Sequence, residues 1–202
     1  MKIKICGLSP IRDVQLCIDL KVNYLGFVFY EKSPRNISLS DIELLSKYDK
    51  KNSSFVAVTI DPSDEFIKKN LVGKFDFIQL HGSETRERVN EIKNMGFKVI
   101  KAIKVKKELD IEKYKKFNNA DIILFDSPSM EKSSEIPKKL ISKLPLGEKY
   151  ALAGSISENN VTNICKLGVN FFDLSSSLES QLGYKDHHKI KSFIKKINEI
   201  KN

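Results

Sequence analysis

Residues 75–103 read FDFIQLHGSETRERVNEIKNMGFKVIKAI and contain one complete strand–helix–strand unit. Two short apolar runs, Phe75–Leu80 and Val99–Ile103, have the length and the β-branched and aromatic content of strands buried on both faces. Between them, apolar residues recur at helical spacing over Val89–Met95 and stop at Gly96, a residue typical of the position just after a helix. The stretch therefore predicts two parallel strands joined by a right-handed crossover helix.

The same alternation continues in both directions to the ends of the sequence. Six further strands are predicted, at Ile3–Cys6, Tyr24–Phe29, Phe55–Ile60, Asp121–Phe125, Tyr150–Ala153 and Phe171–Leu174. Eight such units can close into a barrel, and about 200 residues is the compact lower limit for that fold. An open doubly wound sheet is the alternative, but no G-x-G-x-x-G follows the first strand. We therefore expect an α/β protein, a single-domain (β/α)8 TIM barrel over residues 1–202.

Four of the predicted helices begin at recognisable capping residues. These are Ser9 followed by Pro10, a capping box of Ser40 with Glu43, Ser157, and Asp186 at the start of the last helix. The loosest stretch, Ser127–Ile136, has no such signals and is predicted to be a mobile loop beside the active face of the barrel.

Composition excludes several other classes of protein. The 202 residues carry 35 basic and 26 acidic side chains, a formal charge of +9, and 41% hydrophobic residues, which argues against disorder. The lysines are scattered along the chain, so we interpret the charge as a solvated surface that attracts anionic ligands. A nucleic-acid-binding role is the alternative from another class, and no binding motif supports it. We expect no nucleic-acid partner.

Neither a membrane nor a metal is expected as a partner. No apolar run approaches the roughly 18 residues of a membrane span, and Met1 leads directly into a strand without a signal-peptide core, which predicts a cytoplasmic protein. The three cysteines, Cys6, Cys17 and Cys165, are widely spaced, which excludes a disulfide framework and disfavours structural zinc. His187 and His188 lie together in the last helix without a matching ligand cluster.

Polar residues gather where the predicted strands end, which is where a barrel of this kind forms its site. Taken singly, each also fits a structural role; a cysteine at the end of an apolar strand is more often a small core residue than a base. Their convergence on one mouth favours a functional role. The candidates are Cys6, Arg35, Gln79, His81, Asp126, Gly154, Ser155, Ser175, Ser176 and Ser177.

A series of motifs, in order over essentially the whole chain, resembles the phosphoribosylanthranilate isomerase family of tryptophan biosynthesis. The motifs are KICGL at 4–8, LGFVF at 25–29 with KSPR at 32–35, QLHG at 79–82, IKA at 100–102 and LAG at 152–154. The resemblance implies a cofactor-free Amadori rearrangement of N-(5-phosphoribosyl)anthranilate, a small-molecule phosphoribosyl substrate. Cys6 matches the family's base, Asp126 its acid, and Arg35 its carboxylate-binding arginine.

These roles set requirements on the side chains. A thiol becomes a useful base only if its thiolate is favoured, and we expect a cationic mouth to help Cys6 in this way. Asp126 must instead hold a proton near neutrality, which burial or a nearby anion would promote. Arg35 offers a planar fork that suits a carboxylate.

The substrate phosphate is expected at the backbone amides after the seventh and eighth strands, together with a short helix N-terminus. Gly154, Ser155 and Ser175–Ser177 stand there, although family members usually have glycine at the positions of Ser155 and Ser177. Residues 127–134 read SPSMEKSS where the family commonly has a glycine-rich loop. A divergent phosphosugar-binding barrel with altered substrate or reduced activity is therefore the alternative. The oligomeric state stays open between monomer and homodimer.

Overall fold

The protein is a closed barrel of eight parallel strands, paired in chain order β1-β2-β3-β4-β5-β6-β7-β8 with β8 back on β1. The structure, a computed structural model, describes residues 1–127 and 136–201. The barrel strands are β1 Lys2–Cys6, β2 Tyr24–Phe29, β3 Ser54–Thr59, β4 Phe77–Leu80, β5 Lys98–Lys104, β6 Ile122–Asp126, β7 Tyr150–Leu152 and β8 Phe171–Leu174. The predicted (β/α)8 barrel is confirmed; β2 and β8 have the predicted bounds, and the other six strands differ by one or two residues at one or both ends.

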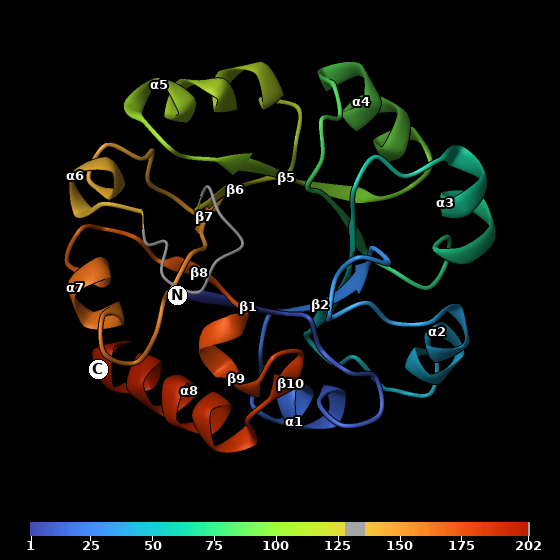
Figure 1. The fold of residues 1–202 in the computed structure, drawn as a ribbon, viewed down its shortest axis with the longest axis horizontal. Coiled ribbons are helices and arrows are strands. Elements are labelled where there is room, and N and C mark those ends of the chain that lie inside the picture. Colours follow the sequence, from blue (N-terminus) through green and yellow to red (C-terminus); the bar gives the residue numbers. More distant parts are fainter. Residues whose placement is uncertain (128–135, 202) are drawn as a thin grey trace.

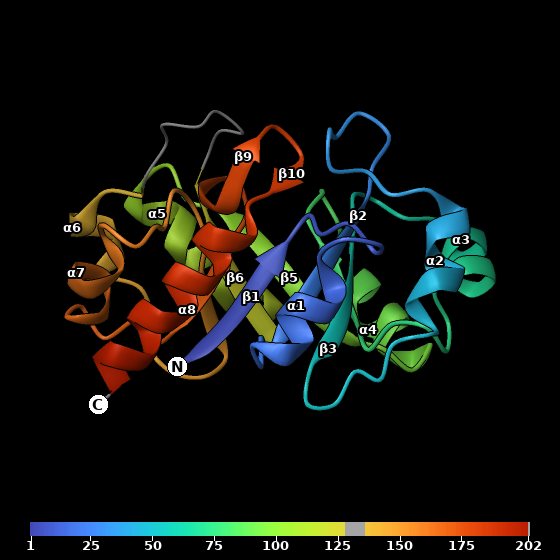
Figure 2. The same ribbon diagram turned by 90° about the horizontal axis from the view of Figure 1, so that it is seen from below.

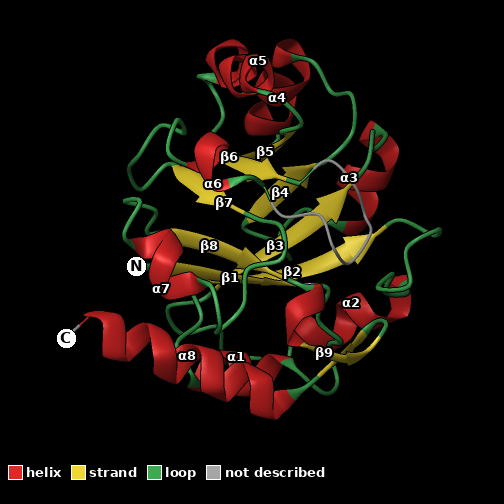
Figure 3. Cartoon of the chain, turned by 60° about the vertical axis from the view of Figure 1, so that its left-hand side comes forward, coloured by secondary structure: helices red, strands yellow, loops and turns green. Residues whose placement is uncertain are grey.

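Helices follow the strands and form the outer layer of the molecule, a ring around the strands in Figure 1. They are α1 Val14–Asp19, α2 Leu39–Leu45, α3 Asp64–Asn70, α4 Arg86–Asn94, α5 Glu108–Ile111, α6 Lys138–Ile141, α7 Val161–Cys165 and α8 His187–Lys201, with 3-10 turns η1 Glu112–Phe117 and η2 Ser176–Leu178. Figure 3 shows the same layering, with the strands enclosed by helices. Among the described residues, no helix is long and apolar enough to cross a membrane.

The core has two parts because successive side chains of a strand point to opposite faces. The larger part fills the space between strands and helices and contains, for example, Phe55 and Ala57 of β3. The smaller part fills the barrel and contains the alternate residues Val56 and Val58. This alternation determines which polar side chains at the strand ends face the barrel axis.

Three helix starts differ from the predictions. Helix α1 begins at Val14 because the carboxylate of Asp13 accepts the Ser9 N–H and closes a turn before the helix. Helix α2 is capped by Ser38, whose hydroxyl accepts from the Asp41 N–H in a reciprocal capping box, so the predicted box of Ser40 and Glu43 is wrong.

At α7 the amide of Ser157 donates to the side chain of Asn160, and the helix begins one residue later, at Val161. The predicted start of the last helix is confirmed, since Asp186 accepts from the His188 and Lys189 amides ahead of α8. Of the predicted mobile loop, residues 128–135 lie outside the described residues.

A short hairpin follows β8 and was not predicted. Strands β9 Glu179–Gln181 and β10 Tyr184–Lys185 pair antiparallel, and Figure 2 shows them at the end of the barrel toward which the arrow of β1 points. At the hairpin's tip, Gly183 has a φ of +81° and lies against the Pro34 carbonyl, where a β-carbon would approach within 2.6 Å. The hairpin therefore packs closely on the loop that carries Arg35.

Candidate active site

Several polar side chains of the barrel wall belong to the inward-facing rows of their strands. In β6, for instance, Ile122 and Leu124 lie in the inner cluster, so Asp126 continues the inward row. The same alternation assigns to the interior Lys4, Cys6, Gln79, His81, Asp126 and Asp173. The strands thus bring the predicted Cys6, Gln79, His81 and Asp126 together, and add two groups that the sequence analysis had not selected.

The first addition is a buried ion pair beneath Cys6. Lys4 Nζ lies 2.9 and 3.0 Å from the two carboxylate oxygens of Asp173, and both residues are almost completely buried. Lys4 Nζ and Cys6 Sγ lie 3.2 and 3.3 Å from the point where a β-carbon on Gly26 would stand. The glycine therefore leaves room for the ammonium and the sulfur to be neighbours.

The cations near Cys6 act on its pKa in the predicted direction, but burial outweighs them. Burial raises the pKa of the Cys6 thiol above its ordinary value, and the Asp173 carboxylate adds to the rise, while Lys4 and Lys185 oppose it. The pKa of Lys4 is itself raised, because Asp173 and Cys6 together outweigh the effect of its burial. A cationic mouth alone therefore does not make Cys6 a thiolate.

Across the barrel, Asp126 is held by two partners. His81 Nε2 lies 3.2 Å from Asp126 Oδ2, and the Ser127 N–H donates to Asp126 Oδ1 at 2.8 Å. Gln79 Nε2 lies 3.3 Å from His81 Nδ1. With the amide donating to Nδ1, the ring carries its proton on Nε2 and presents it to Asp126. His81, predicted to bind substrate, therefore contacts the acid candidate.

Gln79 is buried, and its Oε1 has no hydrogen-bond partner in the described part of the chain. A buried acceptor without a partner costs about 1–3 kcal/mol. A ligand hydroxyl entering the mouth is the natural partner for such an oxygen.

Arg35 forms the third group of the site. Its Nε and Nη2 donate to the two oxygens of Glu179 at 2.6 and 2.9 Å, and Lys185 Nζ donates to the same carboxylate at 2.8 Å. The aliphatic part of Arg35 crosses Gly7, where a β-carbon would lie 2.5 Å from Arg35 Cδ. The guanidinium is thus fixed between the end of β1 and the β9–β10 hairpin.

The Glu179 carboxylate is strongly stabilised as an anion. Burial alone would raise its pKa, but the hydrogen bonds from Arg35 and Lys185 outweigh burial and hold the pKa of Glu179 at about 2. The pair occupies two of the five N–H donors of the guanidinium, so others remain for a bound anion.

The predicted phosphate residues lie in two neighbouring loops. Gly154 has a φ of +98°, and a β-carbon there would approach Ser127 Cβ within 2.8 Å, so only glycine fits. Ser155 also has a positive φ, +49°, the left-handed conformation that favours glycine. Ser177 lies with Ser176 in the turn η2 and is not among the described residues with positive φ, so serine is not strained there. Ser175 donates its hydroxyl to the Cys6 carbonyl, which ties the second loop to the end of β1.

A second buried ion pair supports the loop after β4. The Glu84 carboxylate accepts from the Gly82 and Asp61 amides and from Lys101 Nζ at 2.7 Å, and the ammonium also donates to the Gly82 carbonyl. Lys101 lies in the outward row of β5, because its neighbours Ile100 and Ala102 belong to the inner cluster. This pair therefore fixes the residues next to His81 from outside the barrel.

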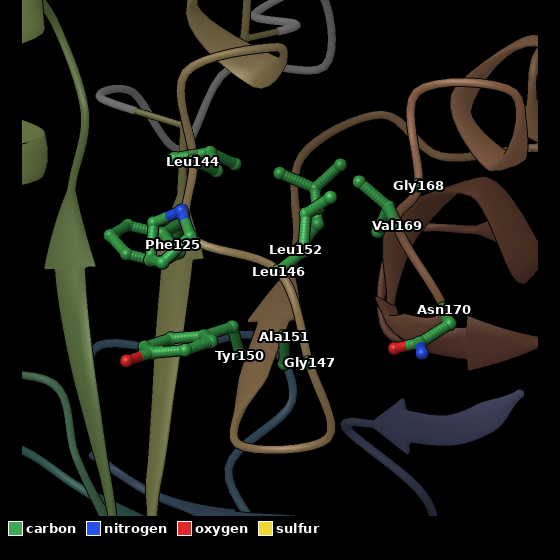
Figure 4. A pocket seen from close by; sticks show the side chains of 11 residues that line it. Phe125, Leu144, Leu146, Gly147, Tyr150, Ala151, Leu152, Gly168, Val169 and Asn170 are labelled. Carbon is green, nitrogen blue, oxygen red and sulfur yellow. The ribbon is translucent and has the colours of Figure 1, made fainter.

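The crevice in Figure 4 lies elsewhere, between the wall at β6 and β7 and the segments that lead into β7 and β8. Its lining is mostly apolar, with Leu144, Leu146 and Val169 beside Tyr150, and it contains no carboxylate, ammonium or thiol. It offers packing and no acid–base chemistry. Among residues 1–127 and 136–201, no group of three or more His, Cys, Asp or Glu side chains could hold a metal ion.

The residues that sequence reasoning missed had a weak signal. Lys4 and Asp173 each interrupt an apolar strand, at KIKIC and FFDL, and a charge inside such a run requires a partner. Glu179 and Lys185 stand in a short polar segment with no strand pattern, so nothing in the sequence connected them with Arg35.

Comparison with known proteins gives one consistent result. The family model described as N-(5'-phosphoribosyl)anthranilate (PRA) isomerase matches residues 3–196. A protein of that name from Thermoanaerobacter pseudethanolicus is 34% identical over 207 residues, covering all of both chains.

Two solved structures are similar over nearly the whole fold. One, of monomers derived from the dimeric Thermotoga maritima isomerase, has a TM-score of 0.82 at 28% identity and covers 98% of this chain and 99% of its own. Another, of such an isomerase in complex with reduced 1-(o-carboxyphenylamino)-1-deoxyribulose 5-phosphate, has a TM-score of 0.83 at 28% identity and the same coverage.

Proposed function

The chain belongs to the N-(5'-phosphoribosyl)anthranilate isomerase family, and from that premise we propose that Cys6 is the general base and Asp126 the general acid of its reaction. The reaction is the Amadori rearrangement of N-(5-phosphoribosyl)anthranilate to 1-(2-carboxyphenylamino)-1-deoxyribulose 5-phosphate in tryptophan biosynthesis. Substrate and product are isomers, so protons move and no oxidant or reductant is required.

The acid acts first. A proton from Asp126 to the furanose oxygen breaks the bond between that oxygen and C1, and the anthranilate nitrogen supplies the electrons as C1=N forms. The contacts from His81 and from the Ser127 amide support this role because they fix the direction of the carboxyl group. His81 is then a positioning residue for Asp126.

The base acts next. Cys6 takes the proton from C2, the C2–H electrons form a C1=C2 double bond, and the nitrogen recovers its lone pair. Loss of the C2 hydroxyl proton and protonation of C1 complete the ketone. The observation that carries the proposal is the placement of Cys6 and Asp126 in inward rows of β1 and β6, three strands apart around one mouth.

The remaining predicted residues hold the substrate. The free donors of Arg35 suit the anthranilate carboxylate, and the unpartnered Oε1 of Gln79 suits a sugar hydroxyl. The loops with Gly154, Ser155 and Ser175–Ser177 suit the phosphate, through their backbone amides. No step in this scheme needs a cofactor. The chain forms one domain. Light scattering would measure whether it is a monomer or a homodimer.

The test is a fluorescence assay that follows consumption of phosphoribosylanthranilate. Cys6→Ala and Asp126→Asn should each lower kcat by a factor of about 10² or more with an unchanged circular dichroism spectrum. The matched control is Cys165→Ala, which changes a cysteine in helix α7 and not at the strand ends that form the mouth. This variant should retain kcat. Near-normal turnover in either site variant would refute the assignment. Absent turnover in the unmodified protein would favour the divergent phosphosugar-binding barrel.

A further inference from the structure

We propose that Lys4 is the counter-ion of the Cys6 thiolate, and that Asp173, which is also paired with Lys4, limits how strongly Lys4 stabilises that thiolate. Lys4 is then a positioning residue for the base, acting through Cys6. The proposal rests on the proposed function in so far as it takes Cys6 to be the base.

The location of the pair is the first argument. Lys4 and Cys6 are two residues apart on β1 and face the barrel axis together, and Asp173 is the register partner of Lys4 on β8. Lys4 is 1% exposed. On the other side, β2 presents Gly26, whose missing side chain leaves the ammonium and the sulfur adjacent.

The energetic cost of the pair is the second argument. Moving an ammonium and a carboxylate out of water costs several kcal/mol per ion, and well-packed apolar residues often serve a core as well or better. The barrel interior is otherwise filled by residues such as Val56, Ile100 and Phe171. Stability alone therefore gives little reason for a charged pair beneath the base.

The charges around the thiol identify Lys4 as the main source of stabilisation. Four charged groups from separate elements face Cys6: Lys4 on β1, Asp173 on β8, Lys185 on β10 and Arg35 in the loop after β2. Lys185 and Arg35 are both paired with Glu179. Lys4 opposes the effect of burial on the thiol pKa more than Lys185 does. Asp126 and His81 face Asp173 from across the barrel.

The arrangement makes two opposite predictions. Lys4→Met removes the cation and should raise the pKa of Cys6, whereas Asp173→Asn removes the competing anion and should lower it. An opposite charge a few ångströms away shifts a pKa by about 1–3 units, so each rate below should change about tenfold or more. A purely structural pair would give no change, or the same change in both variants.

The measurement is the pH dependence of iodoacetamide alkylation at Cys6 in the substrate-free protein, read by peptide mass spectrometry so that Cys17 and Cys165 are counted separately. At pH 7.5, alkylation should slow about tenfold in Lys4→Met and accelerate in Asp173→Asn. Lys101→Met is the matched control, a buried lysine with a carboxylate partner on the outer side of the wall, and should leave the Cys6 midpoint unchanged.

Folding failure of one variant does not remove the test. Lys4→Met leaves Asp173 buried without its cation. If that variant fails to fold, the neutral double variant Lys4→Met with Asp173→Asn is used in its place. The Cys6 pKa of the double variant should still exceed that of the unmodified protein. An unchanged Cys6 midpoint in Lys4→Met or in the double variant, or an unchanged or raised midpoint in Asp173→Asn, would overturn the proposal. Alkylation of Cys6 needs no turnover, so it tests the role of Lys4 independently of catalysis. If Cys6 is not the base, that result appears in a different experiment, as retained activity in Cys6→Ala.

Discussion

Replacement of Glu179 by glutamine tests whether the β9–β10 hairpin orients Arg35 for substrate. In the structure two guanidinium N–H groups and the Lys185 ammonium converge on this one carboxylate, at 2.6, 2.9 and 2.8 Å. Glutamine keeps the shape of the side chain but loses the charge and one acceptor oxygen. Two cations then share a neutral amide.

The magnitude follows from burial. Breaking a buried ion pair by removing one partner costs about 3–5 kcal/mol, and the Arg35 side chain is still 19% exposed, which favours the lower end. We expect a loss of about 3 kcal/mol in the free energy of unfolding, and a melting temperature lower by roughly 6–12 °C for a chain of this size. A less well oriented Arg35 should lose about half of the free energy of one charge-assisted hydrogen bond to the substrate carboxylate. That loss should raise KM about tenfold.

The assay combines urea unfolding with steady-state kinetics. Glu148→Gln is the control, because the pair of Lys2 and Glu148 is solvent-exposed and should contribute less than about 1 kcal/mol. A fall in KM in Glu179→Gln would show that Glu179 competes with the substrate for Arg35. Stability and KM both equal to those of the control would refute the reasoning entirely.

Three further predictions concern the loops and the acid range. Gly154→Ala should lose stability by more than about 1 kcal/mol and raise KM, because its φ is +98° and its β-carbon would meet Ser127; urea unfolding and kinetics measure both. Glu84→Gln should lower stability by about 3 kcal/mol in urea unfolding, since Lys101 would keep its charge without a counter-ion. The pKa of Glu84 is lowered, since Lys101 and the backbone amides outweigh burial, and that of Glu179 is about 2. Both ionised carboxylates therefore stabilise the fold above about pH 4.5, the usual carboxyl range, and this contribution is lost as they are protonated at lower pH. The free energy of unfolding of Glu179→Gln should therefore fall less steeply with acidification than that of the unmodified protein.

The barrel was predictable because its information is local and repeated. Each strand is an apolar run and each helix has one apolar stripe, and only parallel closure satisfies eight such units in this length. Helix starts were less predictable, since Ser38 with Asp41 and Ser40 with Glu43 carry the same capping signal two residues apart. Only the local backbone conformation decides between them.

The positions of the site residues were more predictable than the hydrogen bonds and ion pairs between them. Strand ends located Cys6 and Asp126 at one mouth, but the bonds of His81 to Asp126 and of Arg35 to Glu179 depend on partners 45 and 144 residues away. The help of nearby cations to Cys6 was predictable, but the net rise of its pKa was not, because charge can be counted in a sequence whereas burial cannot. The pairing of charges inside the barrel is likewise a property of the closed ring.

The pair of Lys4 and Asp173 joins residues 169 positions apart, across the seam where β1 meets β8. During synthesis, a chain that has reached only its seventh strand already contains Cys6 and Asp126, yet Lys4 stands at an open sheet edge without the Asp173 carboxylate. The electrostatic surroundings of the thiol come into being when the last strand docks. Alkylation of Cys6 would therefore report completed folding, and a chain clipped before Phe171 would carry Cys6 and Asp126 without the ion pair of Lys4 and Asp173.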